Sequence, residues 1–405
     1  MAADDEKKKR RTSADLGLEI AEHQARLQVI AANYFALTMT ELAATDREYL
    51  ETLEKGLGEF VFVSGTAASI EKIRRLSVKM ASVRREAFTA AAVEVAARQR
   101  ELAAAEVSWA EKVTKAMLPA AEAEKIVEPS PARLDRVADN ALGEGMTTRQ
   151  YYDRLSADEA ARVEAAIADG LANGDSIQEV AKRITGPDGV LKITRNAAER
   201  MTRTITNALA NAAKDAFYQQ NADILVGVEI VATLDGRTCP ICAGLDRKRY
   251  KMGENHPALP IHFNCRCVLL PLTALSAAIP ENRPMARADF MAEAEKKYAS
   301  KYPGKDWAAL APSTKKRYYY AAMKEYERRT GQSAYTDAPG AVSFKKYFTT
   351  YMTEEQRRAW LGPERYEIWK RGNLPLSDFI PPYPNPRLTV DALRELDAAS
   401  LRDAG

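Results

Sequence analysis

Cysteine is absent from almost the whole of this 405-residue sequence. All four cysteines lie between positions 239 and 267, and two of the three histidines, His256 and His262, lie in the same stretch. A second cluster of metal-binding histidines elsewhere in the chain is therefore not expected. The local chemistry of the sequence is concentrated in one segment.

The sequence also lacks a long hydrophobic run. Its most apolar stretch, 268–279, is interrupted by Pro271 and is shorter than the roughly 20 residues that a membrane helix needs. The charged N-terminal residues 1–12 are not followed by an apolar run and a cleavage site, so no secretory signal is expected. We therefore predict no membrane association and synthesis in a reducing cytoplasm, where paired cysteines indicate metal binding before disulfides.

Neither sign of charge dominates. The chain has 59 Lys and Arg against 56 Asp and Glu, a net charge of +3, so any contact with DNA must come from a local patch. Apolar residues make up 46% of the chain and charged residues 28%, which is typical of a soluble globular protein. The length predicts two or three domains.

Most of the chain has the composition of α-helix. Residues 13–127 are rich in Ala, Glu, Leu and Arg, and their few helix breakers predict two long helices joined near 60–66. Between 132 and 190, short helices are predicted by three capping boxes, which pair Thr147 with Gln150, Ser156 with Glu159, and Ser176 with Glu179.

A change of period follows a helix predicted from about Thr194 to Gln219. Residues 226–234 alternate between apolar and other residues, which is largely the pattern of a half-buried strand. The apolar run Val268-Leu269-Leu270 could return beside this strand, with Pro271 at its end or on an edge.

We therefore expect an α+β protein that is predominantly α-helical, with long N-terminal helices, a small zinc-clamped α+β module and an aromatic helical C-terminal region. The predicted regions are a flexible basic tail at 1–12, a long-helix docking region at 13–127, a short-helix connector at 132–190, an α+β module with the cysteines at 191–275, and a C-terminal helical extension at 281–405 with a proline-rich arm at 380–386.

The cysteine spacing is typical of a zinc site. Cys239 and Cys242 lie three positions apart around a proline, so both thiolates can bind one tetrahedral ion. Cys265 and Cys267 form a second pair, and residues i and i+2 of an extended segment point the same way. His262 is an alternative fourth ligand or a residue that supports the ligands. His256 is a weaker candidate.

Other roles for these thiols stay open. Two disulfides could form in oxidising surroundings, or the thiols could be free and buried. A catalytic zinc would need an open coordination position and a base such as Glu254 or Asp246, whereas four or five potential ligands indicate a closed site. A structural zinc that clamps a strand and a loop is the leading interpretation. In small modules such a clamp contributes on the order of 10 kcal/mol.

Together these motifs resemble the phage Mu F-like head morphogenesis proteins, the minor head proteins of tailed bacteriophages. The resemblance rests on Arg203-Thr204 and Asn207 of the predicted helix, on Leu234-Asp235-Gly236-Arg237-Thr238-Cys239-Pro240-Ile241-Cys242, and on Pro260-Ile261-His262-Phe263-Asn264-Cys265-Arg266-Cys267. Phe263 departs from the proline that is common in the family. A less specific block around Leu361-Gly362-Pro363-Glu364-Arg365-Tyr366 is similar to the family's C-terminal extension.

The resemblance implies a non-enzymatic minor head protein that acts in head morphogenesis and DNA packaging. It implies a place in the virion, at the portal vertex in the capsid interior, and in the host cytoplasm during assembly. The implied partners are the portal protein and the major capsid or scaffolding protein, with phage double-stranded DNA bound nonspecifically. The competing hypothesis is a zinc-dependent hydrolase or nuclease that is delivered with the genome.

Two basic patches are candidates for contact with phosphate. One is Lys315, Lys316, Arg317, Lys324, Arg328 and Arg329, and the other is Arg247, Lys248 and Arg249. On a helix, Tyr319, Met323 and Tyr326 would share a buried face and leave the cations of the first patch solvated, which is the ordinary structural alternative to DNA binding.

Overall fold

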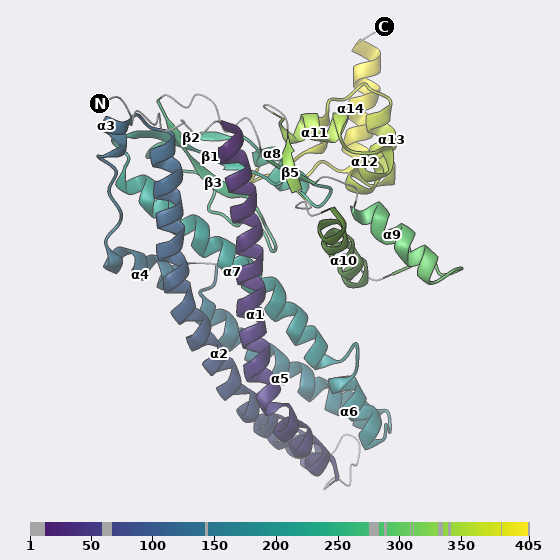
Figure 1. Cartoon of the computed structure of the whole chain (residues 1–405). Helices are drawn as coiled ribbons and strands as arrows, with labels where there is room; N and C mark the ends of the chain where they lie inside the picture. The colour runs from purple at the N-terminus through teal and green to yellow at the C-terminus, as the bar shows by residue number, and fades with distance from the viewer. Residues whose placement is uncertain are drawn as a thin grey trace. The chain divides into compact units, whose positions relative to one another are not determined.

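The computed structural model of the chain is predominantly α-helical with a small three-stranded sheet, as expected (Figure 1). It describes residues 13–58, 67–141, 145–274, 283–286, 290–307, 309–310, 312–330, 335–338, 342–381 and 383–403, so the predicted tail at 1–12 lies outside the described residues. In the described part, no helix is long and apolar enough to cross a membrane. The chain divides into two compact units, one of residues 25–228 and 250–273 and one of residues 1–24, 229–249 and 274–405.

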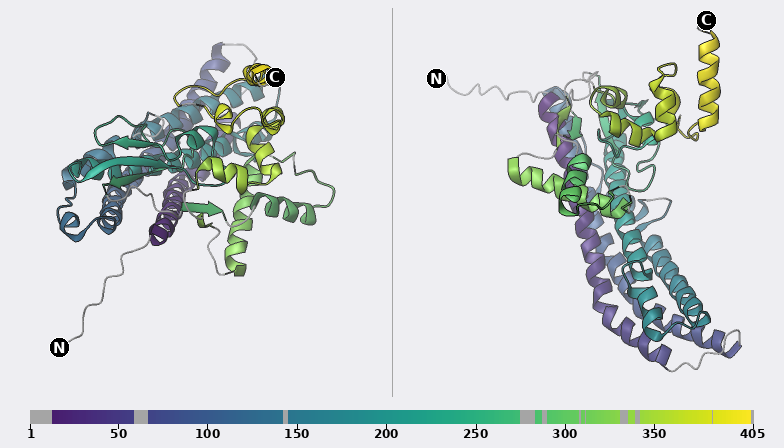
Figure 2. Two further views of the ribbon diagram at one scale, coloured as in Figure 1. Left: turned by 90° about the horizontal axis from the view of Figure 1, so that it is seen from above. Right: turned by 90° about the vertical axis from the view of Figure 1, so that its right-hand side faces the viewer.

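Long helices make up most of the first unit. Its helices are α1 (Ser13–Gly58, from residue 25 on), α2 (Ala67–Ala116), α3 (Ala120–Ala123), α4 (Pro131–Asn140), α5 (Thr148–Ala172), α6 (Ile177–Thr185) and α7 (Val190–Gln220). Helix α2 packs along α5 and α7, as Figure 2 shows from two further sides. The two predicted long helices are confirmed as α1 and α2, and the joint predicted near 60–66 lies outside the described residues.

Apolar residues at helical spacing hold these helices together. Five helices, α1, α2, α5, α6 and α7, each contribute buried side chains to one hydrophobic cluster, which joins them. Its buried members are Tyr49, Leu53, Leu57, Ile73, Leu76, Met80, Val163, Ile167, Val180, Ile184, Val190 and Leu191.

One predicted helix start is wrong. Ser156 lies inside α5, which runs without a break from Thr148 to Ala172. The side chain of Glu159 does not cap a helix; it is buried, and its Oε1 accepts a hydrogen bond of 2.9 Å from Nε of Arg84 on α2. The capping boxes at Thr147 and Ser176 are both confirmed.

The small sheet follows α7. Its strands are β1 (Leu225–Val231), β2 (Arg249–Lys251) and β3 (Val268–Thr273), in the order β2-β1-β3. The predicted return of the chain beside the first strand is confirmed, because β3 pairs with β1. Pro271 lies in β3, which is an edge strand of this sheet, and an edge strand tolerates a residue that has no backbone N–H. Strand β3 packs against α7.

The second unit contains shorter elements. They are α8 (Pro240–Leu245), β4 (Arg283–Ala286), α9 (Phe290–Lys301), α10 (Pro312–Thr330), β5 (Tyr335–Ala338), α11 (Phe344–Thr350), α12 (Glu354–Leu361), α13 (Pro363–Lys370), the 3-10 helix η1 (Leu376–Phe379) and α14 (Val390–Asp403). Strands β4 and β5 pair antiparallel. An aromatic core that includes Phe344, Phe348 and Phe379 joins α11 to α14, and Leu234 and Ala243 from the cysteine segment belong to the same core.

Hydrogen bonds attach the first cysteine turn to this C-terminal core. The carboxylate of Asp246 accepts from the N–H of Ala232 at 3.0 Å and from the N–H of Phe344 at 2.9 Å. The indole Nε1 of Trp360 donates to the carbonyl of Thr238 at 2.6 Å. The turn that carries Cys239 and Cys242 is therefore held from both of its ends by residues of this unit.

Candidate metal centre

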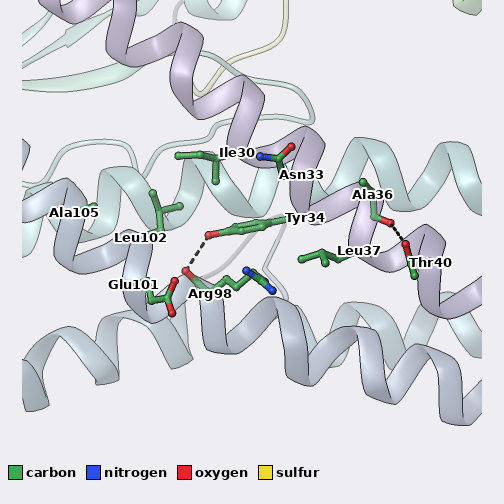
Figure 3. A pocket seen from close by; sticks show the side chains of 10 residues that line it. All are labelled: Ile30, Asn33, Tyr34, Ala36, Leu37, Thr40, Arg98, Glu101, Leu102 and Ala105. Carbon is green, nitrogen blue, oxygen red and sulfur yellow. Dashed lines mark hydrogen bonds between the residues drawn. The ribbon is translucent and has the colours of Figure 1, made fainter.

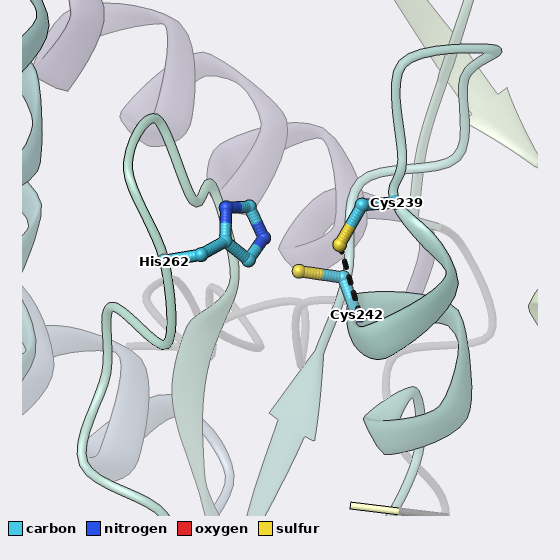
Figure 4. A group of neighbouring side chains, drawn as sticks. All are labelled: Cys239, Cys242 and His262. Atoms are coloured by element: carbon cyan, nitrogen blue, oxygen red, sulfur yellow. Dashed lines mark hydrogen bonds between the residues drawn. The ribbon is translucent and has the colours of Figure 1, made fainter. Parts of the chain in front are cut away.

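The first pair of cysteines lies at the start of α8. Cys239 caps this short helix, Pro240 occupies its first position, and Sγ of Cys239 accepts from the N–H of Cys242 at 3.4 Å. Proline is favoured at the first position because it has no N–H to leave unpaired and its φ is already helical. This turn presents both sulfur atoms on one side of the chain (Figure 4).

The second pair lies just before β3. The N–H of Cys265 donates to the carbonyl of His262 at 3.1 Å, which closes a turn, and Asn264 within it has a φ of 59°. Asparagine tolerates this left-handed conformation better than most residues. The chain then extends through Cys267 into β3.

Helix α7 holds this second segment with polar side chains. Nδ2 of Asn207 donates to the carbonyls of Cys265 at 2.9 Å and Cys267 at 3.4 Å. Nδ2 of Asn211 donates to the carbonyl of Cys267 at 3.2 Å, while its Oδ1 accepts from the N–H of Leu269 at 3.0 Å. Thr204, one turn earlier, accepts from the N–H of Asn264 at 3.1 Å.

The structure brings the five candidate ligands together in two overlapping groups. The ligand atoms of Cys239, Cys242 and His262 all lie within 4.8 Å of one another, and so do those of Cys242, Cys265 and Cys267. Figure 4 shows the first of these groups. Thiolates that share a tetrahedral zinc lie about 3.8 Å apart, because each Zn–S bond is about 2.3 Å long. The spacing and the soft nitrogen and sulfur donors therefore fit zinc. Cys242 is the ligand that both groups share.

The cluster has a buried side and a half-buried side. Cys242, Cys265 and Cys267 are buried, no disulfide joins the four cysteines, and Cys239 and His262 are half-buried. Nδ1 of His262 lies 2.8 Å from the carbonyl of Phe263. An N–H at Nδ1 that donates to this carbonyl fixes the tautomer in which Nε2 can bind a metal. Such a donor set suits a closed structural site.

The same segment is matched by a known family. Residues 161–270 match the model of the family described as Phage Mu protein F like protein. The chain carries a Mu F-like segment. The predicted resemblance is confirmed over this span, which includes α7, β1, β2 and all five candidate ligands. The matched family is named after protein F of phage Mu. No curated protein and no solved structure matches the chain.

The other histidine of the Mu F-like segment, His256, belongs to neither of the two candidate metal groups. Nε2 of His256 is 3.4 Å from Oδ1 of Asp215 on α7, and its Nδ1 is 3.2 Å from the carbonyl of Pro257. The hydrogen bond with Asp215 raises the pKa of His256. These residues line a cavity of about 420 Å³ between α7 and the loop 253–259.

The two carboxylates considered as catalytic bases have structural partners. Asp246 accepts the two N–H groups described above, and Oε2 of Glu254 accepts from the N–H of Lys251 at 3.0 Å. Neither carboxylate belongs to the metal groups found in the described part of the chain.

The first basic patch lies on α10. Arg317, Lys324, Arg328 and Arg329 are exposed and Lys315 is half-buried, while the side chains of Lys316 and Tyr319 are not among those described. Met323 and Tyr326 pack with Phe290 of α9, as expected for the buried face. In the second patch, Arg247 and Arg249 pair with the buried Glu229 at 3.8 and 2.9 Å, and Lys248 is exposed.

A further cavity of about 470 Å³ lies between α1 and α2 (Figure 3). The side chain of Tyr34 on α1 lines this cavity, and its hydroxyl donates a hydrogen bond of 2.9 Å to the carbonyl of Arg98 on α2. Burial raises the pKa of Tyr34 to about 12, so the hydroxyl keeps its proton and stays a donor at neutral pH. The sequence pattern did not indicate this cavity, because it arises from the spacing between two helices.

Proposed function

We propose that the chain is a minor head protein of a tailed phage that acts in head morphogenesis and DNA packaging at the portal vertex, inside the capsid. The observation that carries this proposal is the Mu F-like match over residues 161–270, which contains the complete cysteine and histidine cluster. The long helices of residues 13–127 supply the surface that docks on the portal protein or on the major capsid or scaffolding protein.

The metal centre has a structural role in this proposal. Cys239, Cys242, Cys265 and Cys267, with His262 as the alternative to one of them, would hold zinc. The ion would tie the turn at 239–242 to the segment at 262–267, and its binding free energy would become folding free energy. The centre stabilises the Mu F-like segment and takes no part in a reaction.

The proposed place in the particle can be tested in the phage that encodes the chain. A phage that lacks the gene is complemented with the full chain, and the particles are purified and imaged by electron cryomicroscopy. We expect density for the protein next to the portal, and copurification of the chain with the portal protein from procapsids. Complete, DNA-filled heads formed without the gene would contradict the proposal.

The metal can be tested with the purified full chain. Native mass spectrometry and elemental analysis should find one tightly bound zinc. Cys242→Ser should lose it, because Cys242 belongs to both ligand groups, and should unfold at a lower denaturant concentration. The same preparations are assayed for hydrolase and nuclease activity. A Cys242→Ser protein that stays folded but loses a zinc-dependent hydrolysis would favour the competing hypothesis of a delivered enzyme.

The proposed contact with double-stranded DNA depends on α10. Replacing the exposed Lys324, Arg328 and Arg329 by Gln should weaken nonspecific binding. It should also reduce the slope of log affinity against log salt by about 0.9 for each phosphate contact that is lost. A matched control replaces Arg74, Lys79 and Arg85, three exposed cations of α2, by Gln. Equal binding by both triple variants would contradict a role for α10.

A further inference from the structure

We propose that Asn207 and Asn211 of α7 are positioning residues for the metal centre, which hold Cys265 and Cys267 in ligand geometry before the ion binds. The inference rests on the proposed metal centre. It assigns these two asparagines a role in metal affinity in addition to a role in the fold.

The argument begins with the atoms that the asparagines bind. Asn207 donates to the carbonyls of both ligand residues, Cys265 and Cys267, through one amide group. In an extended segment the carbonyls of residues i and i+2 point one way, and so do their side chains. Fixing the two carbonyls on α7 therefore fixes the direction in which both sulfur atoms point.

The second step is that the asparagines form a connected network. Nδ2 of Asn211 donates to Oδ1 of Asn207 at 3.1 Å and to the carbonyl of Cys267, and its Oδ1 accepts from Leu269. The N–H of Leu269 needs an acceptor, which determines how the amide of Asn211 is oriented. That orientation in turn aims Nδ2 at the ligand segment.

The third step is burial. Asn207 is 4% exposed and Asn211 is 3% exposed, so water does not offer a substitute for a lost partner. Buried networks of satisfied polar groups make a structure rigid, and a rigid site loses less conformational entropy when its ligand binds. A scaffold that holds the two sulfur atoms close together before the ion binds therefore raises metal affinity.

The test uses the full chain with zinc and with cobalt as probes. Asn207→Ala and Asn211→Ala should each weaken zinc affinity, measured by competition with a chelator, by about 10- to 100-fold, as is typical when a residue that supports a metal ligand is removed. Asn196→Ala provides the matched control, because Asn196 is exposed on the same helix. The cobalt-loaded variants should show altered absorption bands, since the thiolate geometry changes.

A purely structural role gives a different result. In that case the variants lose equal stability in the metal-free and the metal-loaded states, zinc affinity and the cobalt spectrum stay unchanged, and the proposal is overturned. Asn207→Asp sharpens the comparison, because a carboxylate of the same size would face two carbonyls. We expect it to bind zinc more weakly than Asn207→Ala does.

A milder variant covers the case in which the asparagine variants do not fold. Thr204→Val keeps the side-chain shape and removes the hydroxyl, which accepts from the N–H of Asn264 and donates to the carbonyl of Arg200 on the same helix. It should still fold and should bind zinc less tightly than the Asn196→Ala control, whereas unchanged affinity would count against positioning by α7. A wild-type chain that binds no zinc or cobalt overturns the metal centre itself, and this result is distinct from a failure of the variants alone.

Discussion

Arg84 shows how single residues hold the helical unit together. Its side chain is 2% exposed, and its guanidinium donates to Glu159 at 2.9 Å, to Asp46 at 2.8 Å and to the carbonyl of Leu42 at 2.7 Å. Glu159 is equally buried, whereas Asp46 is partly solvated. One cation therefore connects α1, α2 and α5, and its planar fork suits several acceptors at once.

We expect Arg84→Met to destabilise the chain by about 3–5 kcal/mol, because Glu159 would be left as a buried charge without its partner. The double variant Arg84→Met with Glu159→Leu should recover much of this loss, since it removes both charges. Chemical denaturation of the single and double variants measures the difference. A double variant that is less stable than the single one would contradict this account of the pair.

His256 predicts a dependence on pH at the residue scale. Its hydrogen bond with Asp215 raises its pKa above the unfolded value of about 6.5. The stabilisation is therefore fully present below about pH 6.5 and is lost as the pH rises through the higher folded pKa. The difference in unfolding free energy between wild type and His256→Gln should shrink over this range. The proposed zinc centre would also respond to pH, but equally in both proteins. A difference that stays constant with pH would refute the prediction.

The elements show which parts of the fold a sequence reveals. The helix at 190–220 and the strand at 225–231 follow from spacing alone, since their apolar residues repeat at helical and alternating periods. The candidate ligands of the metal centre are also indicated by local spacing. Ser156 with Glu159 has the spacing of a capping box but lies inside α5, because Glu159 pairs with an arginine that is 75 residues away.

The asparagines of α7 illustrate the same limit at the site. Asn207 formed part of the family motif, but neither its partners nor any role for Asn211 was predicted. Both bind backbone carbonyls that lie more than 50 residues later in the chain. Backbone carbonyls are present at every residue, so no pattern of side chains indicates which of them an amide will bind.

Gly227 carries a prediction about the pairing of β1 and β2. A Cβ at this position would lie 2.3 Å from the carbonyl oxygen of Tyr250, which is backbone and cannot move aside cheaply. Gly227→Ala should therefore cost about 1–3 kcal/mol through overpacking. Gly236→Ala is the matched control, since nothing lies within 4 Å of its Cβ position. Equal denaturation midpoints for both variants would show that the two strands can separate without cost.

At the scale of the whole molecule, Asp246 connects segments that are far apart in the sequence. It joins Ala232, at the end of the β1 region, to Phe344, at the start of the C-terminal core. The C-terminal helices are therefore attached directly to the residues that carry the first two cysteines.

Asp246→Ala would leave two backbone N–H groups without their acceptor, and each loss should lower the free energy of unfolding by roughly 1 kcal/mol. We expect faster amide hydrogen exchange at Ala232 and Phe344, and across α11, with little change in α2. Asp391→Ala serves as the control, because its side chain is 84% exposed. Exchange that is unchanged at Phe344 would mean that the aromatic core alone holds this region.

The position of Asp246 also sets an order of events during synthesis. All five candidate ligands and the α7 asparagines are made before Phe344, which follows Asp246 by 98 residues. At about 5–20 residues per second, the ribosome needs roughly 5–20 s to make this stretch. In the proposed metal centre, a nascent chain would be able to bind its ion once Cys267 is made, before the C-terminal helices exist. The turn that carries Cys239 and Cys242 would then form first, and Oδ2 of Asp246 would accept from the N–H of Phe344 when the C-terminal core folds.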